Sequence, residues 1–232
     1  MTVADALVEL QRKSRPGWAL EHAGDRLGQE LSAAALRTER ADDAVLSEEG
    51  TDDGSRLGAS RVWVIDPLDG SAGFGSGNPE WAVHVALVID GNPTAGAVAV
   101  PGLGVVGATL EHPEVPSRDD GDQLTVVTGH SRSWTDGARV ASALGGELLS
   151  CGSAGFKAML VASGQADVYV HDAPLYEWDV CAPVAVAAAA GLHVSDAYGA
   201  NFEFNQPFPV VRGLVICRPE LAADVLALVG RS

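Results

Sequence analysis

The sequence predicts a mixed α/β fold in two halves, and three observations lead to that prediction. Alternating apolar and polar residues over 81–110 indicate an antiparallel meander. Beyond residue 123, short apolar strands alternate with helical segments, the pattern of a layered α/β unit. The polar stretch over 111–123 is the best candidate boundary. We therefore expect an α+β half over residues 1–120 and an α/β half over residues 121–232.

Two helices are expected to open the first half. Apolar residues recur at helical spacing over 2–12, and Pro16-Gly17 ends that segment. A second amphipathic run predicts a helix that starts at Asp25 and continues to about Arg40. Because an aspartate at a helix start usually caps it, the residues alone favour Asp25 as an N-cap.

The strand over 62–65 is followed by the stretch with the strongest functional signal. It delivers Asp66 to a turn, Pro67 is expected to stop it, and Asp69 follows as a second carboxylate. Two carboxylates three residues apart can converge at a strand end, and they repel each other unless a cation lies between them. The spacing suggests a divalent metal held by oxygen ligands. An ordinary acidic surface turn remains the alternative at this point.

A short strand over 44–46 precedes this one and ends in Ser47-Glu48-Glu49, so carboxylates end two strands in succession. The meander is then expected as strands over 81–90, 95–100 and 105–110.

The second half is expected to alternate between strands and helices. The expected strands cover 124–128, 146–151, 166–171, 192–195 and 213–217. The expected helices cover 132–144, 154–162, 178–190 and 219–229. Asp179 lies in the first turn of the third helix, where the helix dipole favours an acidic residue without any further role. Since the chain already has Glu48, Asp66 and Asp69, Asp179 nevertheless suggests a fourth ligand from the second half.

Charge and composition exclude several classes of function. Fifteen Lys and Arg against 31 Asp and Glu give a formal charge of −16, which argues against binding nucleic acid or an anionic membrane surface. An anionic ligand would need a local positive centre such as bound metal.

The three cysteines predict buried free thiols in a reducing compartment, and the N-terminus lacks the order of a signal peptide, so a cytoplasmic protein is expected. The histidines show no metal-like spacing, and none is assigned a role.

Three motifs together resemble the inositol monophosphatase superfamily of lithium-sensitive, magnesium-dependent phosphatases. SEEG (47–50) resembles its Glu-Glu motif, IDPLDGSAGF (65–74) its Asp-Pro-x-Asp-Gly-Thr motif, and EWDVCAP (177–183) its Trp-Asp motif, in the family's order. The match runs from about Trp18 to the C-terminus. The resemblance implies a layered αβαβα sandwich of the inositol monophosphatase and fructose-1,6-bisphosphatase type.

The resemblance also implies roles for individual residues. The metal ligands would be Glu48, Asp66, Asp69, Asp179 and the Leu68 carbonyl, holding two or three Mg²⁺ ions, with Li⁺ expected to inhibit. Asp25 and Ser71, which replaces the usual threonine, would orient the attacking water, and this reverses the N-cap interpretation. The amides of Gly70 and Ser71 would hold the phosphate.

Within the superfamily, the EWD motif looks most like the 3'-phosphoadenosine-5'-phosphate (PAP) phosphatases of sulfate assimilation. This implies hydrolysis of PAP to AMP and phosphate by a homodimer, with substrate contacts from Gly70, Ser71, Gly152, Ser153, Lys157 and Glu177. Lys157 could meet a second phosphate or be an ordinary surface lysine. Inositol or fructose phosphates are the alternative substrates. A catalytically silent metal-binding or anion-binding module is the alternative outside enzymes.

Overall fold

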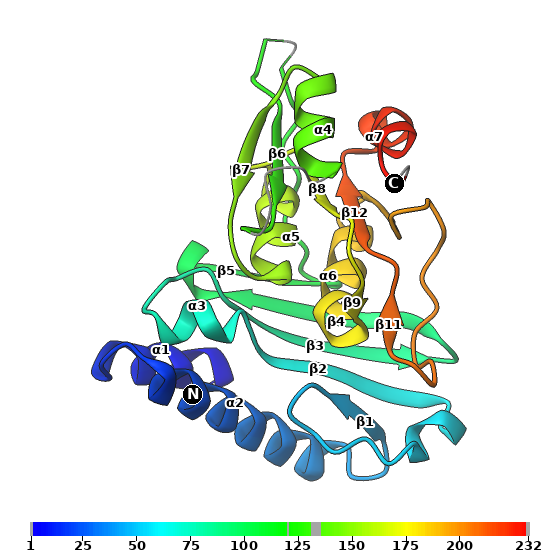
Figure 1. Cartoon of the computed structure of the whole chain (residues 1–232). Helices are drawn as coiled ribbons and strands as arrows, with labels where there is room; N and C mark the ends of the chain where they lie inside the picture. Colours follow the sequence, from blue (N-terminus) through cyan, green and yellow to red (C-terminus); the bar gives the residue numbers. More distant parts are fainter. Residues whose placement is uncertain (1, 120, 131–135, 231–232) are drawn as a thin grey trace.

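Five layers build the molecule in the computed structural model, which describes residues 2–119, 121–130 and 136–230 (Figure 1). In order they are a helical layer, a five-stranded sheet, a middle helical layer, a second five-stranded sheet and an outer helical layer. The expected layered αβαβα sandwich is confirmed. Each sheet buries apolar side chains on both faces, which is why helices flank both of them.

The first layer consists of α1 (Val3–Lys13) and α2 (Trp18–Glu39). The side chains of Thr2 and Asp5 cap α1 reciprocally, as a capping box. α2 begins directly after Pro16-Gly17, seven residues earlier than predicted, so Asp25 lies inside the helix and the N-cap interpretation is wrong. Two buried glycines let α2 approach the first sheet closely: a Cβ on Gly28 would lie 2.8 Å from the Pro67 carbonyl oxygen.

The first sheet has the order β1-β2-β3-β4-β5. Its strands are β1 (Ala44–Ser47), β2 (Arg61–Asp69), β3 (Ala82–Ile89), β4 (Asn92–Val100) and β5 (Val105–Ala108). β1 runs parallel to β2, and the remaining neighbours are antiparallel, which confirms the predicted meander. The prediction that Pro67 ends the central strand is wrong, because β2 continues through a bulge to Asp69.

Two buried helices, α5 (Ala154–Ala162) and α6 (Glu177–Ala189), form the middle layer. Both are rich in alanine and apolar residues, and the main apolar cluster includes residues from both helices and both sheets. α6 lies close to β4 because a glycine faces it: a Cβ on Gly96 would lie 2.8 Å from the Ala185 Cβ and 3.3 Å from the Ala182 carbonyl oxygen.

The second sheet has the order β10-β12-β8-β6-β7. Its strands are β6 (Thr125–Thr128), β7 (Glu147–Ser150), β8 (Val168–His171), β10 (His193–Ser195) and β12 (Leu214–Cys217). The outer layer consists of α4 (Asp136–Ala143) and α7 (Ala222–Leu228). The start of the predicted helix over 132–144 lies outside the described residues.

Several short elements were not predicted. They are α3 (Ser71–Gly75), the pair β9 (Leu175–Tyr176) and β11 (Val210–Val211), and 3-10 turns at Ser55–Gly58 and Pro101–Leu103. The predicted helix over 219–229 begins as a 3-10 turn at Pro219–Leu221 and continues as α7. All three cysteines are buried and unpaired, as expected. Among the described residues, no helix is both long and apolar enough to cross a lipid bilayer.

Candidate metal centre

Three carboxylates meet where the end of β2 faces the start of α6. One carboxylate oxygen each from Asp66, Asp69 and Asp179 lies within 4.8 Å of the other two. Asp66 and Asp69 are buried, and Asp179 is half-buried. The structure therefore brings together side chains that are more than 100 residues apart in sequence.

The bulge in β2 explains how two aspartates three residues apart reach one point. Asp66 pairs with His84 of β3 and Asp69 with Ala82, so Pro67 and Leu68 lie opposite one residue instead of two. Asp66 Oδ1 accepts a hydrogen bond of 3.0 Å from the Leu68 amide, which fixes the turn. A bulge disrupts the regular hydrogen-bond ladder, and the predicted Leu68 carbonyl ligand lies within this bulge.

Asp69 is held in one orientation before any metal binds. Its Oδ2 accepts hydrogen bonds from the Ser153 hydroxyl (2.5 Å) and the Gly155 amide (2.7 Å), and His84 Nε2 lies 3.2 Å away. Burial alone would raise the pKa of Asp69, but His84, Ser153 and Lys157 together lower it to about 2. All of these contacts to Asp69 are made to Oδ2, which leaves Oδ1 available to a cation.

Asp66 and Asp179 have the opposite electrostatics. Burial raises the pKa of Asp66 well above its usual value, and the nearby Asp69 and Glu48 raise it further. Burial, again with Asp69, raises the pKa of Asp179 to about 6, although Asp179 Oδ2 accepts a hydrogen bond of 2.8 Å from the Tyr176 amide. These carboxylates therefore lack the compensating positive charge that a metal ion would supply.

Glu48 approaches the same group of carboxylates from β1. Its carboxyl group is hydrogen-bonded to Asp66, and loss of hydration with the nearby Asp179 raises its pKa to about 7. The residue as a whole is exposed, so Glu48 lies at the solvent edge of the centre.

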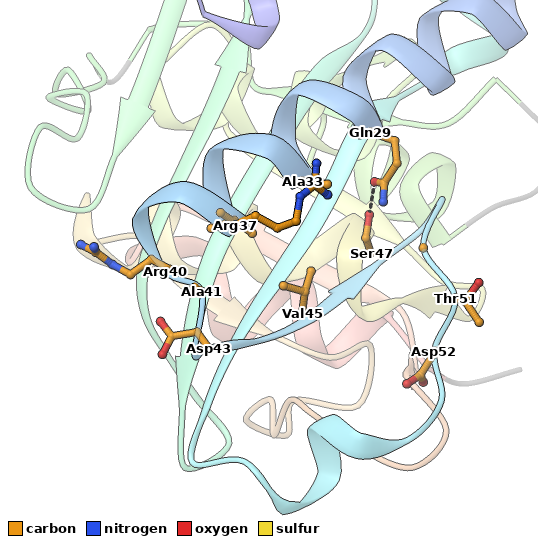
Figure 2. A pocket seen from close by; sticks show the side chains of 12 residues that line it. Gln29, Ala33, Arg37, Arg40, Ala41, Asp43, Val45, Ser47, Thr51 and Asp52 are labelled. Carbon is orange, nitrogen blue, oxygen red and sulfur yellow. Dashed lines mark hydrogen bonds between the residues drawn. The ribbon is translucent and has the colours of Figure 1, made fainter.

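A side-chain hydrogen bond joins α2 to β1 next to this edge. The Ser47 hydroxyl donates to Gln29 Oε1 at 2.7 Å, and Figure 2 shows this bond at one end of a cavity of about 250 Å³ between the two elements. Ser47 directly precedes Glu48, and Gln29 lies one helical turn after Asp25. The bond therefore fixes Asp25 and Glu48 relative to each other.

Asp25 and Ser71 lie together, as the resemblance implied. A hydrogen bond from the Ser71 hydroxyl lowers the pKa of Asp25, but partial burial and the charge of Glu49 outweigh it and raise that pKa to about 6. Ser71 is the first residue of α3, after Gly70 with φ of +89°. Asp25, Gln29 and Glu49 also line an open cavity of about 390 Å³.

The predicted substrate residues have different surroundings. Gly152 and Ser153 lie at the start of α5, where the Ser153 hydroxyl donates a hydrogen bond to Asp69. Lys157 is 4 % exposed, so the surface-lysine interpretation is wrong. Its ammonium group donates to the carbonyl oxygens of Ser153 (2.5 Å), Gly152 (3.2 Å) and Cys151 (3.4 Å), so its charge holds this loop and faces Asp69.

Glu177 is buried and hydrogen-bonded to a distant loop, and its predicted substrate contact stays a prediction. It is 1 % exposed, and its two carboxylate oxygens accept hydrogen bonds from the amides of Asn205 (2.7 Å) and Gln206 (2.9 Å). Through these two bonds, Glu177 holds the loop that contains Asn205 and Gln206.

Sequence reasoning missed His84 and Glu80. His84 is fully buried, and its Nδ1 lies 3.1 Å from the Trp178 carbonyl oxygen while Nε2 faces Asp69. Glu80 Oε2 accepts from the Gly152 amide at 2.7 Å and lies 2.8 Å from His130 Nε2. The alternation of β3 places His84 on the same face as Ala82 and Ala86, and a histidine on that apolar face was the available signal.

The donor set fits a hard divalent cation. Carboxylate oxygens, with a backbone carbonyl beside them, are the ligands that Mg²⁺ uses in proteins, and no thiol or imidazole nitrogen belongs to the group of three. Burial and neighbouring carboxylates raise the pKa values of Asp66, Asp179 and Glu48, and a bound cation would offset this repulsion.

Comparison with known proteins then identifies the family. The model of the inositol monophosphatase family matches residues 20–231. The chain belongs to the inositol monophosphatase family. The three motifs that suggested this relationship supply the residues that meet at the carboxylate centre.

Similar members of the inositol monophosphatase family include nucleotide phosphatases. The chain is 40% identical over 228 residues to the 3'-phosphoadenosine 5'-phosphate phosphatase of Mycobacterium leprae, covering 91% of this chain and 82% of that protein. It is 34% identical over 183 residues to the 3'(2'),5'-bisphosphate nucleotidase CysQ of Escherichia coli strain K12, covering 73% of each. The crystal structure of CysQ from Bacteroides thetaiotaomicron aligns with a TM-score of 0.79 at 25% identity, covering 94% of this chain and 93% of that one.

Proposed function

We propose that this protein is a Mg²⁺-dependent phosphatase that hydrolyses the 3'-phosphate of PAP to give AMP and inorganic phosphate. The observation that supports this most directly is the carboxylate centre of Asp66, Asp69 and Asp179 in a chain 40% identical to a PAP phosphatase. Its strongly acidic composition makes the metal necessary, since a charge of −16 would otherwise repel an anionic ester.

Glu48, Asp66, Asp69, Asp179 and the Leu68 carbonyl would hold the metal ions. When bound, Mg²⁺ would lower the pKa of coordinated water and polarise the phosphoryl oxygens. Asp25, with Ser71 hydrogen-bonded to it, would orient the attacking water and accept its proton. The pKa of about 6 for Asp25 suits this role, because a general base works best when its pKa is near the working pH.

The phosphoryl group would be held by the amides of Gly70 and Ser71 at the turn into α3. Gly70 fits this position because its φ of +89° disfavours other residues and a Cβ there would lie 2.9 Å from the Glu80 carbonyl oxygen. Attack by water in line with the leaving group forms no phospho-enzyme. A covalent aspartyl-phosphate route would instead form a phosphorylated carboxylate, which acid quenching of a single turnover would trap.

Further details of this function extend the same proposal. We expect two or three Mg²⁺ ions during turnover, with Li⁺ as an inhibitor, on the family resemblance. A homodimer is expected on the same basis. A cytoplasmic location is supported by three free, buried thiols. A role in sulfate assimilation is expected on the family resemblance alone.

A panel of phosphate-release assays tests the substrate. Purified protein is assayed with Mg²⁺ and with PAP, inositol 1-phosphate or fructose 1,6-bisphosphate, and kcat/KM is compared. We expect the value for PAP to exceed the others by at least about tenfold, which corresponds to 1.4 kcal/mol of transition-state discrimination. A larger kcat/KM for inositol phosphate would overturn the choice of substrate. No release from any of the three would favour the silent binding module.

A further inference from the structure

A buried arginine follows the Glu-Glu motif and reaches the other half of the chain. Arg56 is 1 % exposed and lies in the 3-10 turn Ser55–Gly58. Its Nε and Nη2 donate to Asp52 Oδ2 at 3.0 and 2.9 Å, its Nη1 donates to Asn205 Oδ1 at 2.8 Å, and its Nη2 donates also to the Gln206 carbonyl oxygen at 3.0 Å. The guanidinium group therefore bonds one residue of its own loop and two residues almost 150 positions later.

Glu177 contacts the same distant segment from the opposite side. It accepts hydrogen bonds from the backbone amides of Asn205 and Gln206. Arg56 donates to the side-chain oxygen of Asn205 and to the carbonyl oxygen of Gln206. The Asn205 amide nitrogen Nδ2 donates back to the Arg56 carbonyl oxygen at 3.1 Å. Asn205 has φ of +63°, in the left-handed region that asparagine adopts more readily than most other non-glycine residues.

The ends of this network lie next to metal ligands from the two halves. Asp52 and Arg56 belong to the loop that follows Glu48, and Glu177 lies two residues before Asp179. We propose that Arg56, Asn205 and Glu177, here called the bridging network, act as positioning residues that set how Glu48 and Asp179 approach the same metal ions. This inference rests on the metal site of the proposed function.

The chemistry of the bridging network suits a role in positioning side chains better than a role in stabilising the fold. A buried charged network is weak evidence for stability, because the desolvation of its charges offsets their attraction. The guanidinium of Arg56 and the carboxylate of Glu177 do not bond each other; each is satisfied by groups of residues 205 and 206 with directional hydrogen bonds. Such bonds fix orientation, which is what two ligands on separate elements need.

The chain contains a matched control on the far side of the molecule. Arg218 is 7 % exposed, donates to Asp167 Oδ1 at 2.7 Å and to the Pro116 carbonyl oxygen at 2.8 Å, and follows β12 of the second sheet. Both arginines are buried, charge-paired and bonded to a distant segment. Only Arg56 contacts the segment that Glu177 holds.

The experiment compares Arg56→Met with Arg218→Met in the full-length protein, first freed of metal. Mg²⁺ affinity is measured by calorimetry, the free energy of unfolding by denaturant, and amide hydrogen exchange over residues 47–56 and 176–180. We expect both variants to lose stability, and only Arg56→Met to weaken Mg²⁺ binding, by at least the roughly tenfold typical of residues that orient metal ligands. Faster amide hydrogen exchange over residues 47–56 and 176–180 should accompany the loss of Mg²⁺ affinity. Equal Mg²⁺ affinities in the two variants would overturn the positioning role.

A milder variant keeps the test decisive if Arg56→Met does not fold. Asn205→Gly removes both side-chain bonds of Asn205 to Arg56, yet keeps its amide bond to Glu177 and tolerates the positive φ. It should fold and still weaken Mg²⁺ binding, and unchanged affinity would contradict the inference. Failure of the parent protein to bind Mg²⁺ would instead overturn the metal site itself.

Discussion

The buried floor and the open rim of the metal centre differ in how they handle negative charge. The floor is Asp69 with its partners Ser153, Gly155 and His84, and there the pKa of Asp69 falls to about 2. The rim is Glu48 and Asp25, whose pKa values rise to about 7 and 6 because they lose hydration and lie near other carboxylates. The floor is therefore organised by hydrogen bonds and charges of the protein itself, whereas the rim would need a bound cation to compensate its charge.

The largest expected effects come from replacing aspartates on β2. Asp66→Asn and Asp69→Asn should each lower kcat/KM by more than about 100-fold, beyond the range typical of residues that only orient metal ligands. Their effects on metal-free protein should differ. Asp69→Asn leaves His84 and Lys157 without their buried counter-charge and should cost about 3 kcal/mol of unfolding free energy, while Asp66→Asn relieves repulsion and should cost little. Equal losses in denaturant unfolding would contradict the distinction between the two aspartates.

Removal of Mg²⁺ should reveal the uncompensated rim through its pH dependence. Because the folded state raises the pKa values of Asp25, Glu48 and Asp179 to about 6, 7 and 6, their contribution to stability is complete below about pH 4 and is lost as pH rises to 7. Metal should reverse that loss. At 100 times its dissociation constant, Mg²⁺ should add about 2.7 kcal/mol at neutral pH, or about 5–10 °C in Tm.

Calorimetric melts at pH 5.0 and 7.5, with Mg²⁺ or with EDTA, measure this difference. The gain in Tm from Mg²⁺ should be larger at pH 7.5. A gain that is larger at pH 5.0 would show that the rim carboxylates already have a counter-charge within the protein. NaCl at matched ionic strength serves as the control for general screening.

The hydroxyl on the rim can be tested without disturbing the floor. Ser71→Ala removes the hydrogen bond to Asp25 and should lower kcat by about 100-fold, the lower end of general acid and base effects, with little change in KM. Ser71→Thr keeps the hydroxyl and should stay within about tenfold of the parent. Steady-state kinetics with PAP provide both values. If kcat of the Thr variant were as low as that of the Ala variant, the space around the Ser71 hydroxyl would matter more than its hydrogen bond to Asp25.

The smallest expected effect sharpens the description of the floor. A Cβ on Gly155 would lie 2.1 Å from His84 Nε2, so Gly155→Ala should displace the imidazole from Asp69 and cost about 1–3 kcal/mol. Gly121→Ala is the control, since a Cβ there meets nothing within 4 Å. Denaturant unfolding gives both costs. Equal costs would mean that His84 can move without loss.

Regular elements and the carboxylate centre could be predicted from sequence because their signals are local. The helix over 154–162 is found at those residues, and the strands of both sheets follow their apolar patterns. The three motifs lie at the ends of β1 and β2 and at the start of α6, and these ends meet in the fold, so their carboxylates meet as well. The short elements β9, β11 and α3 were missed because two to five residues give too little periodicity.

Errors arose where packing overrides a local rule. Asp25 looked like a cap, but the helix starts at Trp18, directly after Pro16-Gly17, and its buried Gly24 and Gly28 pack closely against the first sheet. Pro67 looked like a strand end, but a bulge accommodates it. Lys157 could have been a surface lysine, but it is buried, and both Lys157 and Glu177 have backbone partners; their predicted substrate contacts stay predictions. A sequence pattern marks a charge without indicating which distant backbone group will satisfy it.

The close contact between α6 and β4 limits how this protein can change over evolutionary time. Gly96 allows the backbone around Ala182 and Ala185 to approach the sheet, and the first turn of the same helix presents Asp179. A valine or leucine on that face would push the helix outward and withdraw the aspartate from its neighbours, even in a protein that still folds. The small side chains of this interface therefore work as a spacer for catalysis, and selection for activity should keep them small where selection for stability alone would allow them to grow.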